Sequence, residues 1–475
     1  MKSIFSKFPR TFWVANTIEL FERFAWYGFF MLFANYLTKS SDIGGLEFSQ
    51  NQKGIIMGVG TGILYFLPVI TGAIADKWGY KKVLILSFVI YASAFIIMPL
   101  FNTFTSVFLV YLYLAVGAAL FKPVISATIA KTTTDETSSI GFGIFYMMVN
   151  IGSFLGPLLT LAFKDTSYDL VFYISAAIIS VNFILILFYK EPAQEENTDD
   201  LRQTIIQVFK NIFTVLADFK FVLFLIIAAG FWTMYLQLFF TLPVFIEQWV
   251  DTSSWFNYFS ANMPFIAETY SIGNQMDPEF ITNFDAMFII LFQVFISSII
   301  MRWKALNVMM SGFLISTIGL SLTLITQNPL FILAALFIFA VGEMTASPKI
   351  TEYIGRIAPP DKKALYMGYS FIPMFLGNIL AGVVSGPVYQ KTSDLVSFVR
   401  EEASKINLQL PEQLNQTEEF NALANELNMS HGELVNYLWV QYQPSQIWMV
   451  VAGIGGLAAV SLYFYNRLLI AKSEK

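Results

Sequence analysis

Three ionisable residues, Glu19, Glu22 and Arg23, lie inside an otherwise apolar and aromatic stretch near the start of the chain. The stretch is long enough to cross a bilayer, and charged side chains are costly in its hydrocarbon core. Such residues are kept where they face a cavity and find partners, so they are candidates for moving ions or solutes. At 3.6 residues per turn, Asn16, Glu19, Arg23 and Tyr27 form one stripe, and Glu22 lies beside it.

These charges predict proton-linked chemistry. Pairing with Arg23 favours the ionised form of an acid, whereas burial favours its protonated form. An arriving proton or substrate carboxylate can therefore exchange partners with the pair, which is the exchange that a symporter needs. A static ion pair that holds helices together is the alternative. The only histidine is His431, in a polar stretch, so proton chemistry within the membrane must use carboxylates.

The composition is that of a membrane protein. Of the 475 residues, 56% are hydrophobic and only 13% are charged, whereas soluble domains carry about 25% charged residues. Cys is absent, which excludes disulfides and thiolate metal sites. The net charge of −5 is modest, and no basic stretch predicts nucleic-acid binding. No nucleophile–base set or metal-ligand spacing appears, so we expect a non-enzyme that needs no cofactor besides a proton gradient.

The apolar segments predict an all-α polytopic fold. A membrane span needs about 20 predominantly apolar residues. The N-terminal segment has no small-residue cleavage site after it, so we expect a retained first helix rather than a signal peptide. Twelve segments qualify as spans: 12–38, 52–75, 82–101, 104–130, 140–163, 168–189, 219–245, 281–301, 305–326, 329–355, 363–390 and 445–470.

The distribution of basic residues predicts the orientation. With the N-terminus inside, the cytoplasmic side receives most of the 28 Lys and Arg residues, as the positive-inside rule requires. Both termini are then cytoplasmic, in a plasma membrane that is the inner membrane if the cell is Gram-negative. The basic residues assigned to the outer loops are Lys39, Lys53, Lys164, Lys391, Arg400 and Lys405.

Long polar stretches divide the chain. Residues 1–189 form a predicted N-terminal six-helix bundle, and 219–475 form a C-terminal one. Residues 190–218 become amphipathic and predict an interfacial helix that joins the two halves. Residues 246–280 and 391–444 are predicted external insertions. The second has apolar residues at helical spacing, so we expect a small helical elaboration over the outer mouth rather than a disordered loop.

One short loop between the second and third segments resembles a superfamily signature. Gly72, Asp76, Gly79, Lys81 and Lys82 resemble the signature loop of the major facilitator superfamily. In that superfamily, small residues let two helices approach closely, and the acid and bases latch a cytoplasmic gate. The resemblance implies two six-helix bundles that rock about a site near the middle of the membrane.

The pattern around Glu19, Glu22 and Arg23 resembles the proton-dependent oligopeptide transporter family, and the resemblance covers the whole twelve-helix core. It implies that Lys122, before a proline in the fourth segment, works with the first-helix acids in proton coupling. It further implies that Glu343 binds the substrate amino group. Other positions that match the family and imply substrate contacts are Tyr27, Tyr65, Asn150, Trp232 and Gln237.

The chain also departs from this family. Phe30 stands where members usually have an arginine that helps to capture the peptide carboxylate, and Leu236 replaces an acid before the glutamine. Asp285 aligns with a usual asparagine, so the pocket would lose a cation and gain an anion. A water-facing position at the helix entrance is the alternative for Asp285. We include Phe30 and Asp285 among the predicted substrate-contacting residues.

The sequence predicts a proton-coupled symporter that imports small peptides or peptide-like solutes by alternating access. A proton-coupled transporter or antiporter of a non-peptide solute, such as an amine, drug or metabolite, is the alternative. A transporter fold that acts as a receptor through 391–444 is a third possibility. The expected partners are a small-molecule or peptide substrate, protons and membrane lipid, and we expect a monomer.

Overall fold

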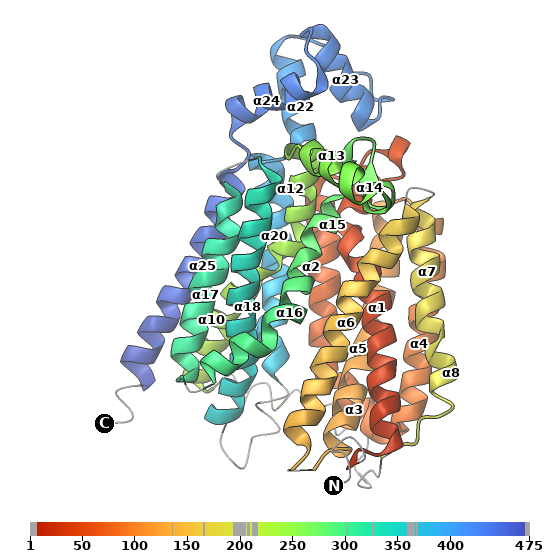
Figure 1. The fold of residues 1–475 in the computed structure, drawn as a ribbon, viewed down its shortest axis with the longest axis vertical. Helices are drawn as coiled ribbons and strands as arrows, with labels where there is room; N and C mark the ends of the chain where they lie inside the picture. Colours follow the sequence, from red (N-terminus) through yellow and green to blue (C-terminus); the bar gives the residue numbers. More distant parts are fainter. Residues whose placement is uncertain are drawn as a thin grey trace.

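The computed structural model describes residues 7–134, 136–164, 167–192, 206, 210, 217–301, 303–324, 327–358, 366 and 369–470. Its helices run in two groups that lie side by side (Figure 1). Helix α1 begins and helix α25 ends at the same end of the molecule, and α22, α23 and α24 lie beyond the opposite end (Figure 1). We call residues 394–442 the cap, and the end of the molecule that carries them the cap end.

The first half packs around α1, which contacts α5, α6, α7 and α8. Its elements are α1 (Arg10–Thr38), η2 (Ser41–Ile43), α2 (Gln50–Phe66), α3 (Pro68–Trp78), α4 (Tyr80–Ile97), η3 (Met98–Leu100), α5 (Phe104–Lys131), α6 (Ser138–Lys164), α7 (Tyr168–Ser180) and α8 (Asn182–Leu185).

The second half packs around α10, α17, α18, α20 and α25. Its bundle elements are α10 (Phe219–Tyr235), α11 (Gln237–Phe240), α12 (Leu242–Trp249), α16 (Phe284–Ile300), α17 (Ala305–Ser321), η4 (Leu322–Leu324), α18 (Pro329–Ile357), η6 (Tyr369–Phe371), α20 (Ile372–Val383), η7 (Val384–Val388), α21 (Tyr389–Thr392), α25 (Gln446–Tyr465) and η8 (Asn466–Ile470). The insertion between α12 and α16 contains α13 (Ser253–Asn262), α14 (Pro264–Thr269), an antiparallel pair β1 (Ser271–Ile272) and β2 (Gln275–Met276), and α15 (Pro278–Thr282).

The predicted all-α polytopic membrane fold is confirmed. In the described part of the chain, nine helices are long and apolar enough to cross a membrane, and the bent pair α2–α3 makes a tenth. The remaining two predicted spans correspond to α1, which has 29 residues and carries buried charges, and to α17, which has 17 residues. The predicted linker helix within 190–218 lies largely outside the described residues.

A proline bends the second span next to the region of the α1 charges. Helix α2 ends at Phe66, α3 starts with Pro68, and the two axes differ by 44°. Proline has no N–H to donate to the preceding turn and its ring clashes there, so a helix breaks at this position. Tyr65 lies one turn or less before the bend, at the point where the span changes direction.

The two halves meet closely along α2 and α20. A methyl group added at Gly58 would lie 2.8 Å from the Cα atom of Gly382, closer than real Cβ contacts occur. The crossing of these helices therefore requires glycine, because any larger residue would push the two backbones apart. Further contacts between the halves join α1 to α12 and α6 to α15 and α16.

The cap contains three helices, α22 (Leu395–Lys405), α23 (Gln416–Glu426) and α24 (His431–Tyr442). Helices α23 and α24 each start with a capping box, which satisfies backbone N–H groups at the helix start. The cap also contacts the first half: the Gln416 N–H donates to Glu47 Oε1 (3.1 Å), and the Thr417 hydroxyl donates to Asp42 Oδ1 (3.0 Å). The cap therefore bridges from its own half to the loop that follows α1.

Candidate transport site

The charged residues of α1 form one buried ion cluster. Arg23 Nε lies 3.2 Å from Glu19 Oε1 and also pairs with Glu22 Oε2. The Tyr91 hydroxyl of α4 donates to the other oxygen of Glu22 (2.5 Å). None of the three charged side chains is more than 8% exposed. Each acid therefore has a partner within the first half, and the α1 stripe predicted from helical spacing is present.

Lys122 lies near this cluster but uses a different partner. Its Nζ atom lies 5.1 Å from the centre of the Tyr65 ring, a cation–π arrangement. Among the described residues, Arg23 rather than Lys122 makes the ion pairs with Glu19 and Glu22. The structure thus brings the four predicted proton-coupling residues into one region, with Lys122 on an aromatic face beside the acids.

A cavity of about 180 Å³ lies between the two halves, next to this cluster. Helices α1, α2 and α6 line one side, and α10, α11, α16 and α18 line the other. The predicted substrate-contacting residues that line it are Tyr27, Phe30, Tyr65, Asn150, Trp232, Asp285 and Glu343. Gln237 is not among the lining residues: its amide donates to Thr233 O (2.9 Å), and it is fully buried at the start of α11.

Tyr235 is a cavity residue that the sequence reasoning missed. Its hydroxyl donates to Glu343 Oε1 (3.0 Å), and its ring stacks on Phe339 of α18. It lies three residues after Trp232, close to one helical turn, and this spacing is the signal that could have found it.

The predicted gate loop lies between α3 and α4. Gly79 has a φ of +92°, a conformation that L side chains rarely adopt, which explains the glycine at this turn. Asp76 accepts a hydrogen bond from the Tyr80 hydroxyl (2.9 Å), and Lys131 Nζ lies 4.9 Å from the centre of the Tyr80 ring. Gly72 lies in α3, and Lys81 and Lys82 lie in the first turn of α4.

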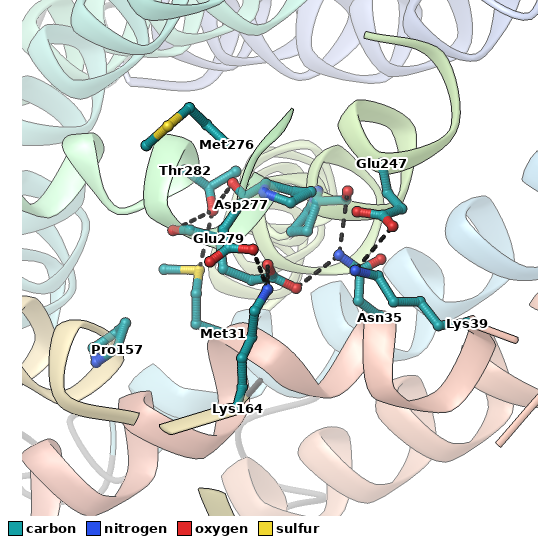
Figure 2. A network of polar contacts seen from close by, with 12 residues as sticks. Met31, Asn35, Lys39, Pro157, Lys164, Glu247, Met276, Asp277, Glu279 and Thr282 are labelled. Carbon is teal, nitrogen blue, oxygen red and sulfur yellow. Dashed lines mark hydrogen bonds and ion pairs between the residues drawn. The ribbon is translucent and has the colours of Figure 1, made fainter. Parts of the chain in front are cut away.

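A second buried charge network lies at the cap end, and Figure 2 shows its side chains. Lys164 of α6 pairs with Asp277 and lies 3.8 Å from Glu279 Oε2. Lys39, just after α1, lies 2.9 Å from Glu247 Oε1. The first half supplies the cations of this network and the second half supplies the acids, so the ion pairs cross the interface between the halves.

Uncharged groups extend the same network. Asn35 Nδ2 of α1 donates to Glu279 Oε1 (2.7 Å), so an amide of the first half also reaches the acids of the second half (Figure 2). Lys53 of α2 is fully buried and donates to the carbonyl oxygen of Phe240 (2.9 Å), where α11 ends. Gln50 Nε2 donates to Asp394 Oδ1 at the start of the cap (3.0 Å). Among the described residues, these polar contacts between the halves lie together at the cap end.

Burial and neighbouring charges set the protonation of this network. Burial is the largest cause that raises the pKa of Asp277 to about 6, and nearby Glu279 adds to it, while Lys164 and Lys39 oppose it. For Lys39, burial disfavours the charged form, but Glu247, Tyr168 and Glu279 outweigh it and raise the pKa well above its ordinary value. Lys39 therefore stays charged, whereas Asp277 titrates near the physiological range.

Lys39, Lys53 and Lys164, which the sequence analysis placed in the outer loops, are buried in the structure. These lysines are 5%, 0% and 3% exposed. Their partners lie far along the chain in the other half, so no local pattern could have paired them. The available signal was their position at the ends of predicted spans, opposite acids at the ends of spans in the second half.

A family model described as "Major Facilitator Superfamily" matches residues 17–251 and 249–393. The chain belongs to the major facilitator superfamily. A Na(+), Li(+), K(+)/H(+) antiporter of Planococcus maritimus is 23% identical over 71% of this chain and 81% of the relative. The Dipeptide and tripeptide permease B of Salmonella typhimurium is 32% identical, but over only 31% of this chain and 30% of the permease.

The solved structures support the same fold. A POT family transporter in complex with 5-aminolevulinic acid matches with a TM-score of 0.71 and 16% identity, over 97% of each chain. A peptide transporter POT in complex with sulfate matches with a TM-score of 0.68 and 15% identity, over 97% of this chain and 96% of the other. The predicted resemblance to POT transporters is thus confirmed for the fold, and the fold is that of a transporter rather than an enzyme.

Proposed function

We propose that this transporter is a proton-coupled symporter that imports small peptides or peptide-like solutes by alternating access. The observation that carries the proposal is the buried cluster of Glu19, Glu22 and Arg23 in α1, next to a cavity between the two halves. Ionisable groups inside a membrane span are functional by default, because each is costly to keep there.

A proton can switch this cluster without creating an isolated charge. When Glu22 is ionised it pairs with Arg23, and Tyr91 donates to its second oxygen. A proton on Glu22 would weaken the pair and leave Arg23 with Glu19 alone. Arg23 would then be freer to move, and the packing of α1 against the cavity would change with it. Protonation is thereby linked to the conformation of the helix that lines the cavity.

The network at the cap end supplies the second element, a closed gate. Lys39 and Lys164 from the first half meet Glu247, Asp277 and Glu279 from the second, and all but Glu247 are almost fully buried. Opening of this end requires these ion pairs to separate and to become hydrated. With the cap end outside, as the basic residues predict, these ion pairs support a gate that is closed to the outside.

The peptide assignment rests on likeness to peptide transporters of the same fold, and on Glu343 and Asn150 in the cavity lining. A second candidate is exchange of a non-peptide cation for protons. The relative from Planococcus maritimus is a cation–proton antiporter by name, and the match spans 81% of its length. The acids of the cavity lining are compatible with either cargo. The two candidates are distinguished by whether protons move in the same direction as the solute or in the opposite direction.

The deciding experiment uses purified protein in liposomes that contain a pH-sensitive dye. Di- and tripeptides, amines and nucleosides are first screened for thermal stabilisation of the protein, and each hit is then added outside. Symport predicts acidification of the lumen when the solute is added, together with its accumulation under an inward proton gradient. Alkalinisation of the lumen would identify an antiporter and overturn the proposal.

A further inference from the structure

The side of the cavity that is formed by the second half carries a pair of carboxyl groups. Asp285 of α16 and Glu343 of α18 line it, are 5% and 8% exposed, and lie close enough for one carboxyl group to hydrogen-bond the other. Tyr235 donates to Glu343 Oε1. Apart from the other carboxyl group of the pair, no N–H or O–H group of the described residues donates to Asp285 Oδ1 or Glu343 Oε2. Two buried oxygen atoms at the cavity wall therefore lack a donor from outside the pair.

In the part of the cavity wall that the structure describes, no cation balances these acids. Of the described residues that line the cavity, none is Lys, Arg or His, and Asp285 and Glu343 are its charged members. Of the bases near the cavity, Arg23 is paired with the α1 acids, and Lys122 lies over the Tyr65 ring. Lys349, on α18, is paired with Glu352. When one proton is shared between the two carboxyl groups, the wall carries one negative charge.

Physical chemistry then restricts what can bind. An uncompensated carboxylate in a buried site costs several kcal/mol, so a bound cation that pairs with it is strongly favoured. A solute carboxylate would bring a further negative charge to a wall that has no cation to receive it. The aromatic rings of Tyr27, Phe30, Trp232 and Phe239 add electron-rich surfaces, which also attract cations.

We infer that the cavity selects a small organic cation, whose ammonium group lies between Asp285 and Glu343 and which carries no free carboxylate. The amide of a dipeptide has this chemistry, whereas the free dipeptide does not. The inference rests on the transport function proposed above and narrows its substrate class. Asp285 is then the residue that turns the cavity from a site for zwitterions into a site for cations.

The test compares two probes that differ in one group, alanyl-phenylalanine and its C-terminal amide. Binding to the purified protein is measured by calorimetry, and uptake by competition in liposomes. We expect the amide to bind at least about tenfold more tightly, which corresponds to about 1.4 kcal/mol. Asp285→Asn keeps the side-chain size and removes the charge. It should weaken binding of the amide and reduce the ratio of the affinities for the amide and the free dipeptide. Glu136→Gln, at a side chain that is 78% exposed, is the matched control and should leave the ratio unchanged.

Each outcome decides the inference. Equal or tighter binding of the free dipeptide overturns it, and proton-driven uptake of that dipeptide would leave the proposed function standing. Failure of the amide to bind also overturns it. If neither probe binds but sodium or potassium ions bind and exchange for protons, the inference and the proposed function both fail. If Asp285→Asn does not fold, the ratio of the two probes on the unaltered protein still decides.

Discussion

The two halves of the molecule hold their buried charges in different ways. In the first half, Glu19 and Glu22 both pair with Arg23 on the same helix, and nearby Lys122 supplies the second positive charge. In the second half, Asp285 and Glu343 face the cavity, and none of the described residues in its lining is basic. One set is balanced inside its own bundle, whereas the other requires a charge from solution.

This difference indicates a division of roles. A balanced cluster can gain or lose a proton in every conformation, because its partners move with it as part of one bundle. An unbalanced pair is stabilised by a bound cation or by a proton, so its charge state depends on whether a cationic cargo is bound. Coupling then requires a connection between the halves, and the ion pairs at the cap end are the strongest polar connection in the described structure.

The largest effect is expected from breaking that connection with Lys164→Met. The change leaves Asp277 and Glu279 buried without their cation, and removing one partner of a buried ion pair costs about 3–5 kcal/mol. The closed cap end should be disfavoured by about 100-fold or more, since about 1.4 kcal/mol corresponds to tenfold. The chain has no cysteine, so Ser153→Cys in the cavity lining gives a single labelling site. Labelling by an impermeant maleimide added at the cap end should become much faster.

A matched control removes a different lysine ion pair. Lys7 and Glu136 pair at 3.0 Å, but their side chains are 51% and 78% exposed, and such pairs contribute little. Lys7→Met should therefore leave the labelling rate of Ser153→Cys unchanged. Equal labelling in the Lys164→Met protein would show that the cap-end network does not hold the halves together.

The second prediction unbalances the first half alone. Glu22→Gln keeps the size of the side chain but removes the proton acceptor that pairs with Arg23. A gradient of two pH units supplies about 2.7 kcal/mol per proton, enough for about 100-fold accumulation of solute. In the variant, accumulation should fall to about onefold, while exchange of labelled for unlabelled solute continues. The measurement is solute accumulation in liposomes with the membrane potential held at zero.

Full proton-driven accumulation by Glu22→Gln would contradict the role of this cluster. Loss of exchange as well as accumulation would point instead to a structural role, because the protein could no longer change conformation. Loss of accumulation with retained exchange would show that the cluster of the first half couples protons to transport without being needed for the conformational change.

The sequence predicted much of the fold because its signals are local. Apolar segments of membrane-spanning length predicted helices that the structure contains, and helical spacing placed Glu19, Glu22 and Arg23 on neighbouring faces of one helix. Tyr65, Asp285 and Glu343 reach the same cavity from three helices. Their convergence was implied by the family resemblance and could not have been derived from local spacing.

The cap-end network shows where such reasoning stops. Lys164 and Asp277 are 113 positions apart, and each looks like an ordinary polar residue near the end of a span. Only the packing of α6 against α15 brings them together and removes both from water. Burial is a property of the assembled halves, so a count of basic residues per loop could not have predicted that Lys164 is buried.

A smaller effect is expected at Tyr65, which holds Lys122 beside the balanced cluster. Tyr65→Leu removes the aromatic face that lies 5.1 Å from Lys122 Nζ, a contribution of about 1 kcal/mol. We expect the initial rate of uptake to fall about fivefold. Tyr65→Phe keeps the ring and should retain most of the rate. A similar loss in both variants would assign the effect to the hydroxyl group. The cation–π contact would then not be what holds Lys122 in place.

The smallest expected effect is a pH dependence of the closed cap end. The pKa of Asp277 is raised from its ordinary 3.8 to about 6, mainly by burial, and opening would return it towards the ordinary value. The closed state therefore binds the extra proton, so this contribution is fully present below about pH 3.8 and is lost as the pH rises through about 6. Lowering the pH from about 7 to about 5.5 should favour the closed state about fourfold. Cysteine labelling at position 153, corrected for the reactivity of a free thiol, should slow by this factor.

Asp277→Asn provides the control, because it cannot titrate. Its labelling should lose the pH dependence while Lys164 keeps Glu279 as a partner. If labelling speeds up on acidification, protonation separates the halves instead of holding them, and the cap-end network would then respond to protons in the sense proposed for Glu22. The second half would still be the one that binds a cationic cargo. Protons, however, would then act on acids of both halves.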